Sequence, residues 1–249
     1  MLHCTSLTMA PAYSSLFDSF LWPEESPMKK QILAAAIAAF AVSGAAVAHE
    51  PGDVILRVGA AHVAPDVDSG RIKVGGAKVS GSKADVKDDT QLGLTATWIV
   101  APHLGVELLA ATPFTHTIKV KGVNPAIDGT LGKATHLPPT LSAQYFFLDT
   151  KSRFQPYVGV GLNYTWFFNE KLSSKAKANN FHGLELENSF GWALQVGADI
   201  AISDKLFLNA AVWKIDIDTQ AKTRLGNTPV KVDVEVDPWV YFVGIGYKF

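Results

Sequence analysis

Large apolar residues alternate with small or polar residues in the last thirteen residues, 237–249. Every second position there is bulky: Trp239, Tyr241, Val243, Ile245, Tyr247 and Phe249. A period of two predicts a β-strand with two different faces. Aromatic rings at both ends of the apolar face, with aliphatic side chains between them, are typical of a strand that faces lipid. Because a strand of a soluble sandwich can also alternate, this strand alone does not identify a membrane barrel. Other segments with the same alternation are needed.

Seven further segments supply those partners. In residues 153–169, for example, Val158, Val160 and Leu162 lie opposite Gly159, Gly161 and Asn163. A soluble barrel would place the bulky residues inside, whereas here they form the continuous outer face of a membrane barrel. We therefore predict an all-β fold, an eight-stranded antiparallel transmembrane β-barrel. Its strands are expected at 53–64, 88–100, 103–118, 133–148, 153–169, 187–202, 205–222 and 231–249, and a change of phase near Asn209 predicts a β-bulge there.

The predicted connections alternate in length. Tight turns at 100–103, 149–152 and 203–204 alternate with longer polar segments at 65–87, 119–132, 170–186 and 223–230. Outer-membrane barrels keep short turns on the periplasmic side, so both ends of the mature chain are expected there. The strands exceed the roughly 9–11 residues that cross a bilayer, which predicts a wall that continues above the outer surface. Residues 170–186 leave room for a short helix.

The first 48 residues are expected to be absent from the mature protein. Met28-Lys29-Lys30 begins a basic region, an apolar run covers 32–42, and Ala46-Val47-Ala48 forms a cleavage signal. This order predicts a signal peptide at 28–48, cleaved between Ala48 and His49; the alternative is a buried N-terminal helix. Residues 1–27 are interpreted as a misassigned start site, the alternative being a long basic region that is also removed. Residues 49–249 then form the barrel.

Composition narrows the class of protein. Charged residues make up 18% of the chain, below the roughly 25% of soluble domains. No apolar run is long enough to span a bilayer as a helix, and a net charge of −1 gives no indication of nucleic-acid binding. The single cysteine, Cys4, lies in the removed segment. The mature chain is therefore expected to lack disulfides, thiol catalysis and thiolate metal sites.

Several stretches resemble a known family. They are 90–95 (TQLGLT), 105–114 (GVELLAATPF), 136–141 (HLPPTL), 156–159 (PYVG), 212–219 (VWKIDIDT) and 237–240 (DPWV). Through them, residues 28–249 resemble the outer membrane protein W (OmpW) family. The resemblance implies a barrel in the outer membrane of a Gram-negative bacterium, with a narrow apolar channel for small hydrophobic molecules. Some members are described as colicin receptors or stress-responsive proteins. Tyr247 and the terminal Phe249 look like the signal that the barrel-assembly machinery reads.

Polar residues are expected inside the periplasmic half of the barrel. An eight-stranded barrel has room inside for side chains or one small ligand. The alternation turns five polar residues inward near the short turns: Arg57, Glu107, Gln144, Gln195 and Asp199. Since an unpaired buried charge is costly, Arg57 should meet Glu107 or Asp199. We predict a polar plug; the alternatives are simple packing of a narrow barrel and a selective ion path.

Prolines indicate a weak point in the wall. A hairpin symmetric about 125–126 places Pro113 across from Pro138, with Pro139 beside it. Each proline removes a donor from the hydrogen-bond ladder. We hypothesise that the resulting gap between the third and fourth strands is a lateral gate into the membrane. A strand bend without a transport role is the alternative.

The remaining polar residues give little indication of chemistry. The mature histidines are scattered and accompany no serine nucleophile motif: His49, His62, His103, His116, His136 and His182. His116 and His136 can approach each other across their hairpin, which hints at a site, but two histidines are too few for a metal and we interpret them as solvated histidines at a loop edge. Asp216 and Asp218 share one strand face, either as a cation site or as a solvated or lumen-facing pair. No catalytic residue, metal site or cofactor is predicted.

These observations favour a channel for passive uptake of small hydrophobic molecules, with lateral release into the membrane. One rival is a structural barrel, or a colicin or phage receptor, that does not transport. The other is a lipid-modifying barrel enzyme. The expected partners are outer-membrane lipid, the barrel-assembly machinery, hydrophobic solutes and, for the receptor hypothesis, colicin or phage. Nucleic acid is not expected to bind.

Overall fold

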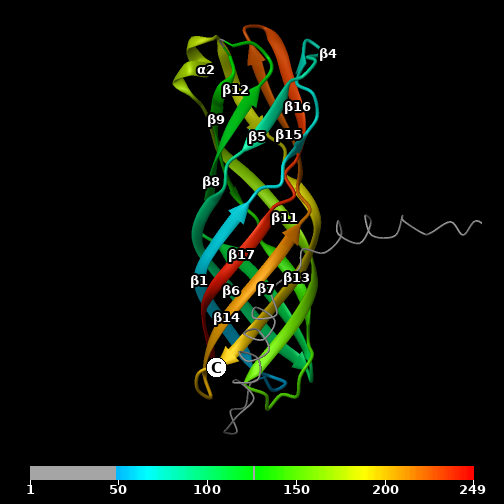
Figure 1. Cartoon of the computed structure of the whole chain (residues 1–249), viewed down its shortest axis with the longest axis vertical. Helices are drawn as coiled ribbons and strands as arrows, with labels where there is room; N and C mark the ends of the chain where they lie inside the picture. Colours follow the sequence, from blue (N-terminus) through cyan, green and yellow to red (C-terminus); the bar gives the residue numbers. More distant parts are fainter. Residues whose placement is uncertain (1–48, 126) are drawn as a thin grey trace, which may run out of the picture. The chain divides into compact units, whose positions relative to one another are not determined.

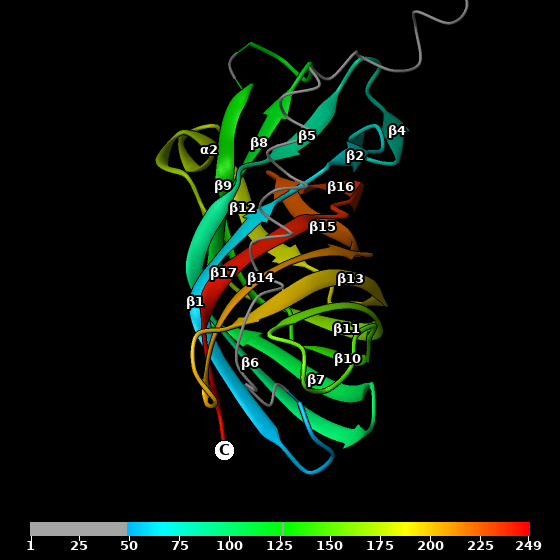
Figure 2. The same cartoon turned by 60° about the horizontal axis from the view of Figure 1, so that its bottom comes forward.

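A computed structural model describes residues 49–125 and 127–249 (Figure 1). The predicted start-site segment and signal peptide, with Ala48, lie outside the described residues. Eight antiparallel strands close into a barrel, because β10 pairs with β11 and β1 with β17. They are β1 (Val54–Ala64), β6 (Asp89–Ala101), β7 (Leu104–Ala111), β10 (Thr140–Phe146), β11 (Phe154–Leu172), β13 (Ser189–Ala201), β14 (Leu206–Ile215) and β17 (Trp239–Lys248). The predicted fold class is confirmed, and Figure 2 shows these strands enclosing the interior.

Above this barrel stands a second tier of strands, the outer extension. It comprises β2 (Asp68–Ser69), β3 (Lys73–Val74), β4 (Ala77–Lys78), β5 (Lys83–Val86), β8 (Phe114–Lys121), β9 (Gly129–Leu137), α2 (Ser174–Ala178), β12 (Phe181–Leu186), β15 (Asp218–Leu225) and β16 (Thr228–Glu235). The predicted continuation of the wall and the short helix in 170–186 are both confirmed. Among the described residues, no helix is long and apolar enough to cross a membrane.

The outward faces show where lipid contacts the barrel. In the eight-stranded part, bulky apolar side chains point outward; Phe190 is 69% and Val243 is 66% exposed. The outward positions of β8 and β9 are instead threonines and lysines, such as Thr115, Lys119 and Lys133. Since lysine is costly in hydrocarbon, the lower barrel spans the membrane and the outer extension stands above it.

Four of the predicted strands are interrupted where barrel and extension meet. The breaks fall at 112–113, 138–139, 216–217 and 236–238, of which three contain proline. The predicted bulge near Asn209 is wrong, because β14 keeps an unbroken register there, with Asn209 opposite both Asp199 and Gly244. Asn209 simply faces inward between Phe207 and Ala211. The phase seemed to change because this interior accepts both bulky apolar and polar side chains.

Glycines let one large ring fill the middle of the barrel. Phe242 is 1% exposed and lies over Gly93 and Gly244. A Cβ atom at Gly93 would stand 2.9 Å from the Phe242 ring, and one at Gly244 would stand 2.7 Å from it. Both distances are too short for real carbon contacts. These glycines are therefore part of the packing that closes the barrel between the two tiers.

The C-terminus lies at the lower end of the barrel, as does His49, so the prediction that both mature ends share one side is confirmed. The Phe249 amide donates to the Val54 carbonyl at 3.0 Å. Its ring is 67% exposed and packs against Tyr247 with centroids 4.8 Å apart. The last strand therefore ends in an exposed aromatic pair.

Deleting Phe249 should reduce insertion into the outer membrane more than it affects the finished barrel. The ring contacts little besides Tyr247, so its loss removes little folded-state packing. Membrane and periplasmic fractions should be compared after pulse expression, with Phe249→Tyr as the control that keeps an aromatic terminus. Normal membrane levels of the truncated chain would count against an assembly role for Tyr247 and Phe249.

Candidate functional site

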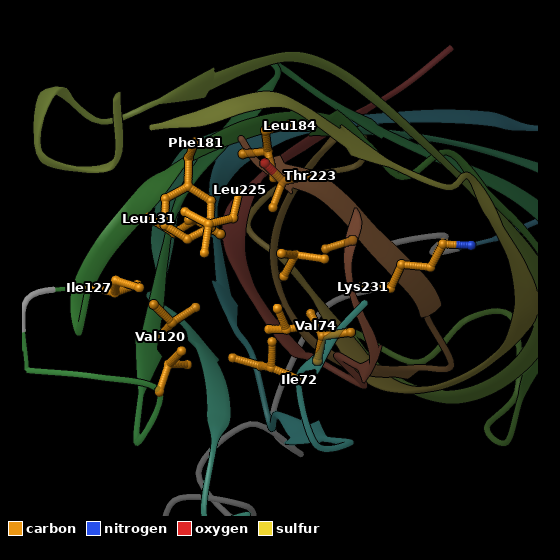
Figure 3. A pocket seen from close by; sticks show the side chains of 14 residues that line it. Ile72, Val74, Val120, Ile127, Leu131, Phe181, Leu184, Thr223, Leu225 and Lys231 are labelled. Carbon is orange, nitrogen blue, oxygen red and sulfur yellow. The ribbon is translucent and has the colours of Figure 1, made fainter. Parts of the chain in front are cut away.

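The outer extension encloses an apolar cavity near its top. Fourteen side chains line this cavity of ≈ 30 Å³, almost all of them aliphatic or aromatic (Figure 3). A second cavity of ≈ 50 Å³ shares four lining residues with it: Val120, Leu131, Ala221 and Val232. The lining follows from strand alternation, because the positions that face inward on β8, β9, β15 and β16 are mostly apolar and the positions between them are mostly polar. The polar exceptions among the inward positions are His116, His136, Thr219 and Thr223. The two cavities therefore lie side by side and share part of their wall, and we call them together the apolar space.

A pair of histidines lines the second cavity. His116 and His136 come from neighbouring strands, and their Nε2 atoms lie 3.0 Å apart. The rings are 6% and 4% exposed, so the interpretation of these two residues as solvated loop-edge histidines is wrong. Phe114 and Phe167 pack against the His136 ring at centroid distances of 5.6 and 5.5 Å. Burial lowers the pKa of His116, and burial followed by the charge of His116 lowers the pKa of His136 to about 3.

The wall beside these two histidines is interrupted between β7 and β10. Their last paired residues are Leu109 and Thr140, and β8 and β9 begin pairing at Phe114 and His136. Between these points 110–113, which ends in Pro113, and 137–139, which ends in Pro138 and Pro139, face each other without ladder pairs among these described residues. Pro113 and Pro139 are exposed, and Pro138 is buried.

The same proline segment is held firmly on its other side. The side-chain Nδ2 of Asn163 donates to the Pro138 and Pro139 carbonyls at 3.2 and 3.3 Å. The backbone N–H of Tyr164 donates to the Pro139 carbonyl at 3.1 Å. The interruption therefore belongs to the β7–β10 side and not to the β10–β11 side.

A polar network, defined here as the side chains bonded around Arg57, fills the lower barrel. Arg57 Nε donates to Asp199 Oδ1 at 2.9 Å, and Nη2 donates to Oδ2 at 2.5 Å. Its Nη1 donates to Glu107 Oε2 at 3.3 Å and to Thr97 Oγ1 at 2.6 Å. Arg57 thus contacts both predicted carboxylates. The fork-to-carboxylate geometry is the strongest form of such a contact.

Amides join this network to the opposite wall. Gln195 Nε2 donates to Glu107 Oε1 at 2.8 Å, and Gln144 Nε2 donates to Gln195 Oε1 at 3.1 Å. All five predicted residues are at most 2% exposed. An apolar molecule crossing this layer would have to break charge-assisted bonds in a region that offers no water to replace them.

Sequence reasoning missed several members of the network, among them Thr95, whose Oγ1 accepts from Arg57 Nη1 at 3.4 Å. His49 Nε2 lies 3.0 Å from Asp199 Oδ2, Asn209 Nδ2 donates to Asp199 Oδ1 at 2.8 Å, and Thr97 bonds both Arg57 and Glu107. Thr97 shares the inward face of β6 with Thr95, so alternation could have identified it. Asn209 was hidden by the bulge that we wrongly expected. His49 precedes the first strand, where no periodicity places a side chain.

The other candidate groups named from the sequence lie outside the polar network. Asp218 is exposed and Asp216 is half-buried. Within the described residues, no group of three or more histidine, cysteine, aspartate or glutamate side chains is placed to hold a metal ion. His62 bonds Thr90 Oγ1 at 2.8 Å, and His103 Nδ1 bonds the Phe146 carbonyl at 2.9 Å.

Comparisons with known proteins agree with this architecture. The pattern that defines the OmpW family matches residues 50–249. Outer membrane protein W of Escherichia coli (strain K12) is 41% identical, over 89% of this chain and 100% of that protein. The crystal structure of the outer membrane protein OprG from Pseudomonas aeruginosa is 50% identical, with a TM-score of 0.78, over 81% of this chain and 98% of that one. The dibenzothiophene metabolism operon protein PahQ of Pseudomonas aeruginosa is 28% identical, over 78% of this chain and 87% of that protein.

Proposed function

Because the chain belongs to the OmpW family of Gram-negative outer-membrane β-barrels, we propose that it is a channel for passive uptake of small hydrophobic molecules. Solute enters the apolar space of the outer extension and leaves sideways, through the interrupted wall at Pro113, Pro138 and Pro139, into the membrane. The observation that carries the proposal is spatial. The apolar space descends to His116 and His136, and His136 lies two residues before Pro138 and pairs with Phe114, the residue after Pro113.

The polar network supports a sideways exit. Directly below the cavity, a buried layer of apolar side chains that includes Trp213, Ile215 and Phe242 fills the barrel. Below that layer, Arg57, Asp199 and Glu107 close the axis with fully buried charges. Lipid beside the wall is as apolar as the solute, so the lateral step costs no transfer into water. We propose that these residues act as a plug that keeps ions and polar solutes out of this route.

The apolar space is too small to hold a solute without movement of its walls. Its larger part measures ≈ 50 Å³, whereas a cavity that holds benzene measures about 150 Å³. Side chains and hairpins of the outer extension must therefore move apart when solute enters. Such hairpins open more easily than a fully paired membrane wall. Because PahQ is named for a dibenzothiophene operon, aromatic hydrocarbons and their relatives are reasonable first solutes.

A receptor function is the second candidate. The outer extension presents ordered hairpins well above the membrane, and their outward positions carry charged and polar side chains. Colicin or phage could recognise such a surface without any transport. A lipid-modifying enzyme has less support: His116 is bonded to His136 and to the Lys87 carbonyl rather than to a nucleophile and a carboxylate.

Uptake must be measured across a lipopolysaccharide leaflet, because phospholipid bilayers alone pass apolar molecules unaided. Cells lacking their own OmpW-family protein should take up N-phenyl-1-naphthylamine faster when they carry this chain than when they carry an empty vector. Fluorescence rises as the dye reaches lipid, so its initial rate reports entry. An unchanged rate at normal barrel levels would reject the channel, and colicin or phage sensitivity gained by the same cells would favour the receptor.

A further inference from the structure

The hydrogen bonds of the histidine pair fix where its protons lie. His116 Nδ1 is 2.5 Å from the Lys87 carbonyl oxygen, which can only accept, so this nitrogen carries a proton. In a neutral ring the His116 Nε2 is then an acceptor. It faces His136 Nε2 at 3.0 Å, so the proton between them belongs to His136. The remaining nitrogen, His136 Nδ1, therefore presents a bare lone pair.

Both rings are neutral at ordinary pH. The pKa of His136, about 3, means that it stays uncharged through the range in which bacteria grow. A positive charge on either ring would also stand among apolar side chains in the cavity wall, which is costly. The chain of donors and acceptors is thus settled by geometry: Lys87 carbonyl, His116, His136.

The lone pair of His136 Nδ1 has no partner among the residues that the structure describes. The atom is buried, and no hydrogen bond reaches it. The cavity that His136 borders is otherwise lined by apolar groups, His116 and Thr219, whose hydroxyl donates to the Glu187 carbonyl at 2.6 Å. A buried acceptor left without a donor costs free energy. A water molecule is poorly suited to fill the role, because it needs two to four polar partners and the side chains of this wall offer it at most Nδ1 and the accepting oxygen of Thr219.

We infer that His136 Nδ1 is a binding site for the hydroxyl group of a hydrophobic solute, so that the channel favours apolar molecules with one neutral hydroxyl, such as phenols, over those without a donor. This inference rests on the proposed uptake function and specifies its substrate class. An anion is excluded because the lone pair repels it and the lining offers no positive charge. A hydroxyl that binds Nδ1 exchanges its bond to water for a bond to this nitrogen and removes the cost of the unpaired acceptor, whereas a solute without a donor leaves that cost in place.

Imidazole nitrogen NMR of the folded protein tests the site without any substitution. Phenol and anisole share one ring, but only phenol has a hydroxyl donor. Adding phenol should shift the His136 Nδ1 resonance, and adding anisole should leave it in place. An equal response to both, or none to phenol, would overturn the inference.

Uptake measurements separate this inference from the function on which it rests. The ratio of the phenol uptake rate to the anisole uptake rate should be about fivefold higher in cells that carry the protein than in cells that lack it, as expected for one hydrogen bond. His136→Phe should remove that preference, whereas His62→Phe, on a half-exposed histidine outside the cavity, should keep it. If both solutes enter at equal rates in the native protein, the inference fails and uptake stands. If neither enters, both fail.

Discussion

Replacing Asp199 with leucine should destabilise the folded barrel by about 3–5 kcal/mol, the usual cost of leaving a buried charge without its partner. The change removes both bonds of the Arg57 fork and leaves only Glu107, at 3.3 Å, to balance the guanidinium. Asn209 Nδ2 and His49 lose their bonds to the same carboxylate. Urea unfolding in lipid vesicles, followed by tryptophan fluorescence, measures the free energy of unfolding.

Two variants make this result specific to the network. Asp204→Leu lies on an exposed turn at the same end of the barrel and should change stability by no more than about 0.5 kcal/mol. Arg57→Met combined with Asp199→Leu and Glu107→Gln should recover much of the loss, because these changes remove all three buried charges together and leave none without a partner. If Asp199→Leu costs no more than Asp204→Leu, the network does not hold the lower barrel together.

Replacing Pro138 and Pro139 together with alanine should slow uptake of N-phenyl-1-naphthylamine by about tenfold. Alanine restores two backbone N–H donors opposite 110–113, where β7 and β10 lack paired residues. Because successive N–H groups of a strand point to opposite sides, one of the two faces β7. A ladder bond there favours the closed wall by about 1–1.5 kcal/mol, and 1.4 kcal/mol corresponds to a factor of ten. Initial dye uptake at matched barrel levels is the measurement.

The control for this pair is Pro229→Ala. Pro229 is exposed in β16 of the outer extension, away from the interrupted wall. Its replacement should leave uptake unchanged. Unchanged uptake in the correctly folded Pro138 and Pro139 double variant would show that the proline pair only bends the strands.

Alternation predicted the barrel because lipid and interior impose opposite demands on successive residues. The same rule turned Arg57, Glu107 and Asp199 inward, and the structure places them in one network. It failed at Asn209, where a polar residue among apolar ones was read as a change of phase although the register is continuous. The interior of this barrel is mixed, so polarity alone does not report which way a side chain points.

The histidine pair shows a second limit of the sequence. Hairpin symmetry predicted that His116 and His136 approach each other, but not that they are buried. Their burial depends on β12, β15 and β16, which arrive from distant parts of the chain to enclose the cavity. Likewise, His49 joins Asp199 across 150 residues. Contacts of this kind follow from closure of the fold and leave no local pattern.

The central claim is that an apolar solute passes through the outer extension and leaves through the wall above the polar network. The most direct test is the position of bromobenzene in crystals of the protein, located by the anomalous scattering of bromine. We expect bromine in the apolar space near His136 or at the interruption beside Pro113 and Pro138, and none beneath Arg57 and Asp199. Bromine in the lower barrel, below that ion pair, would contradict the lateral route.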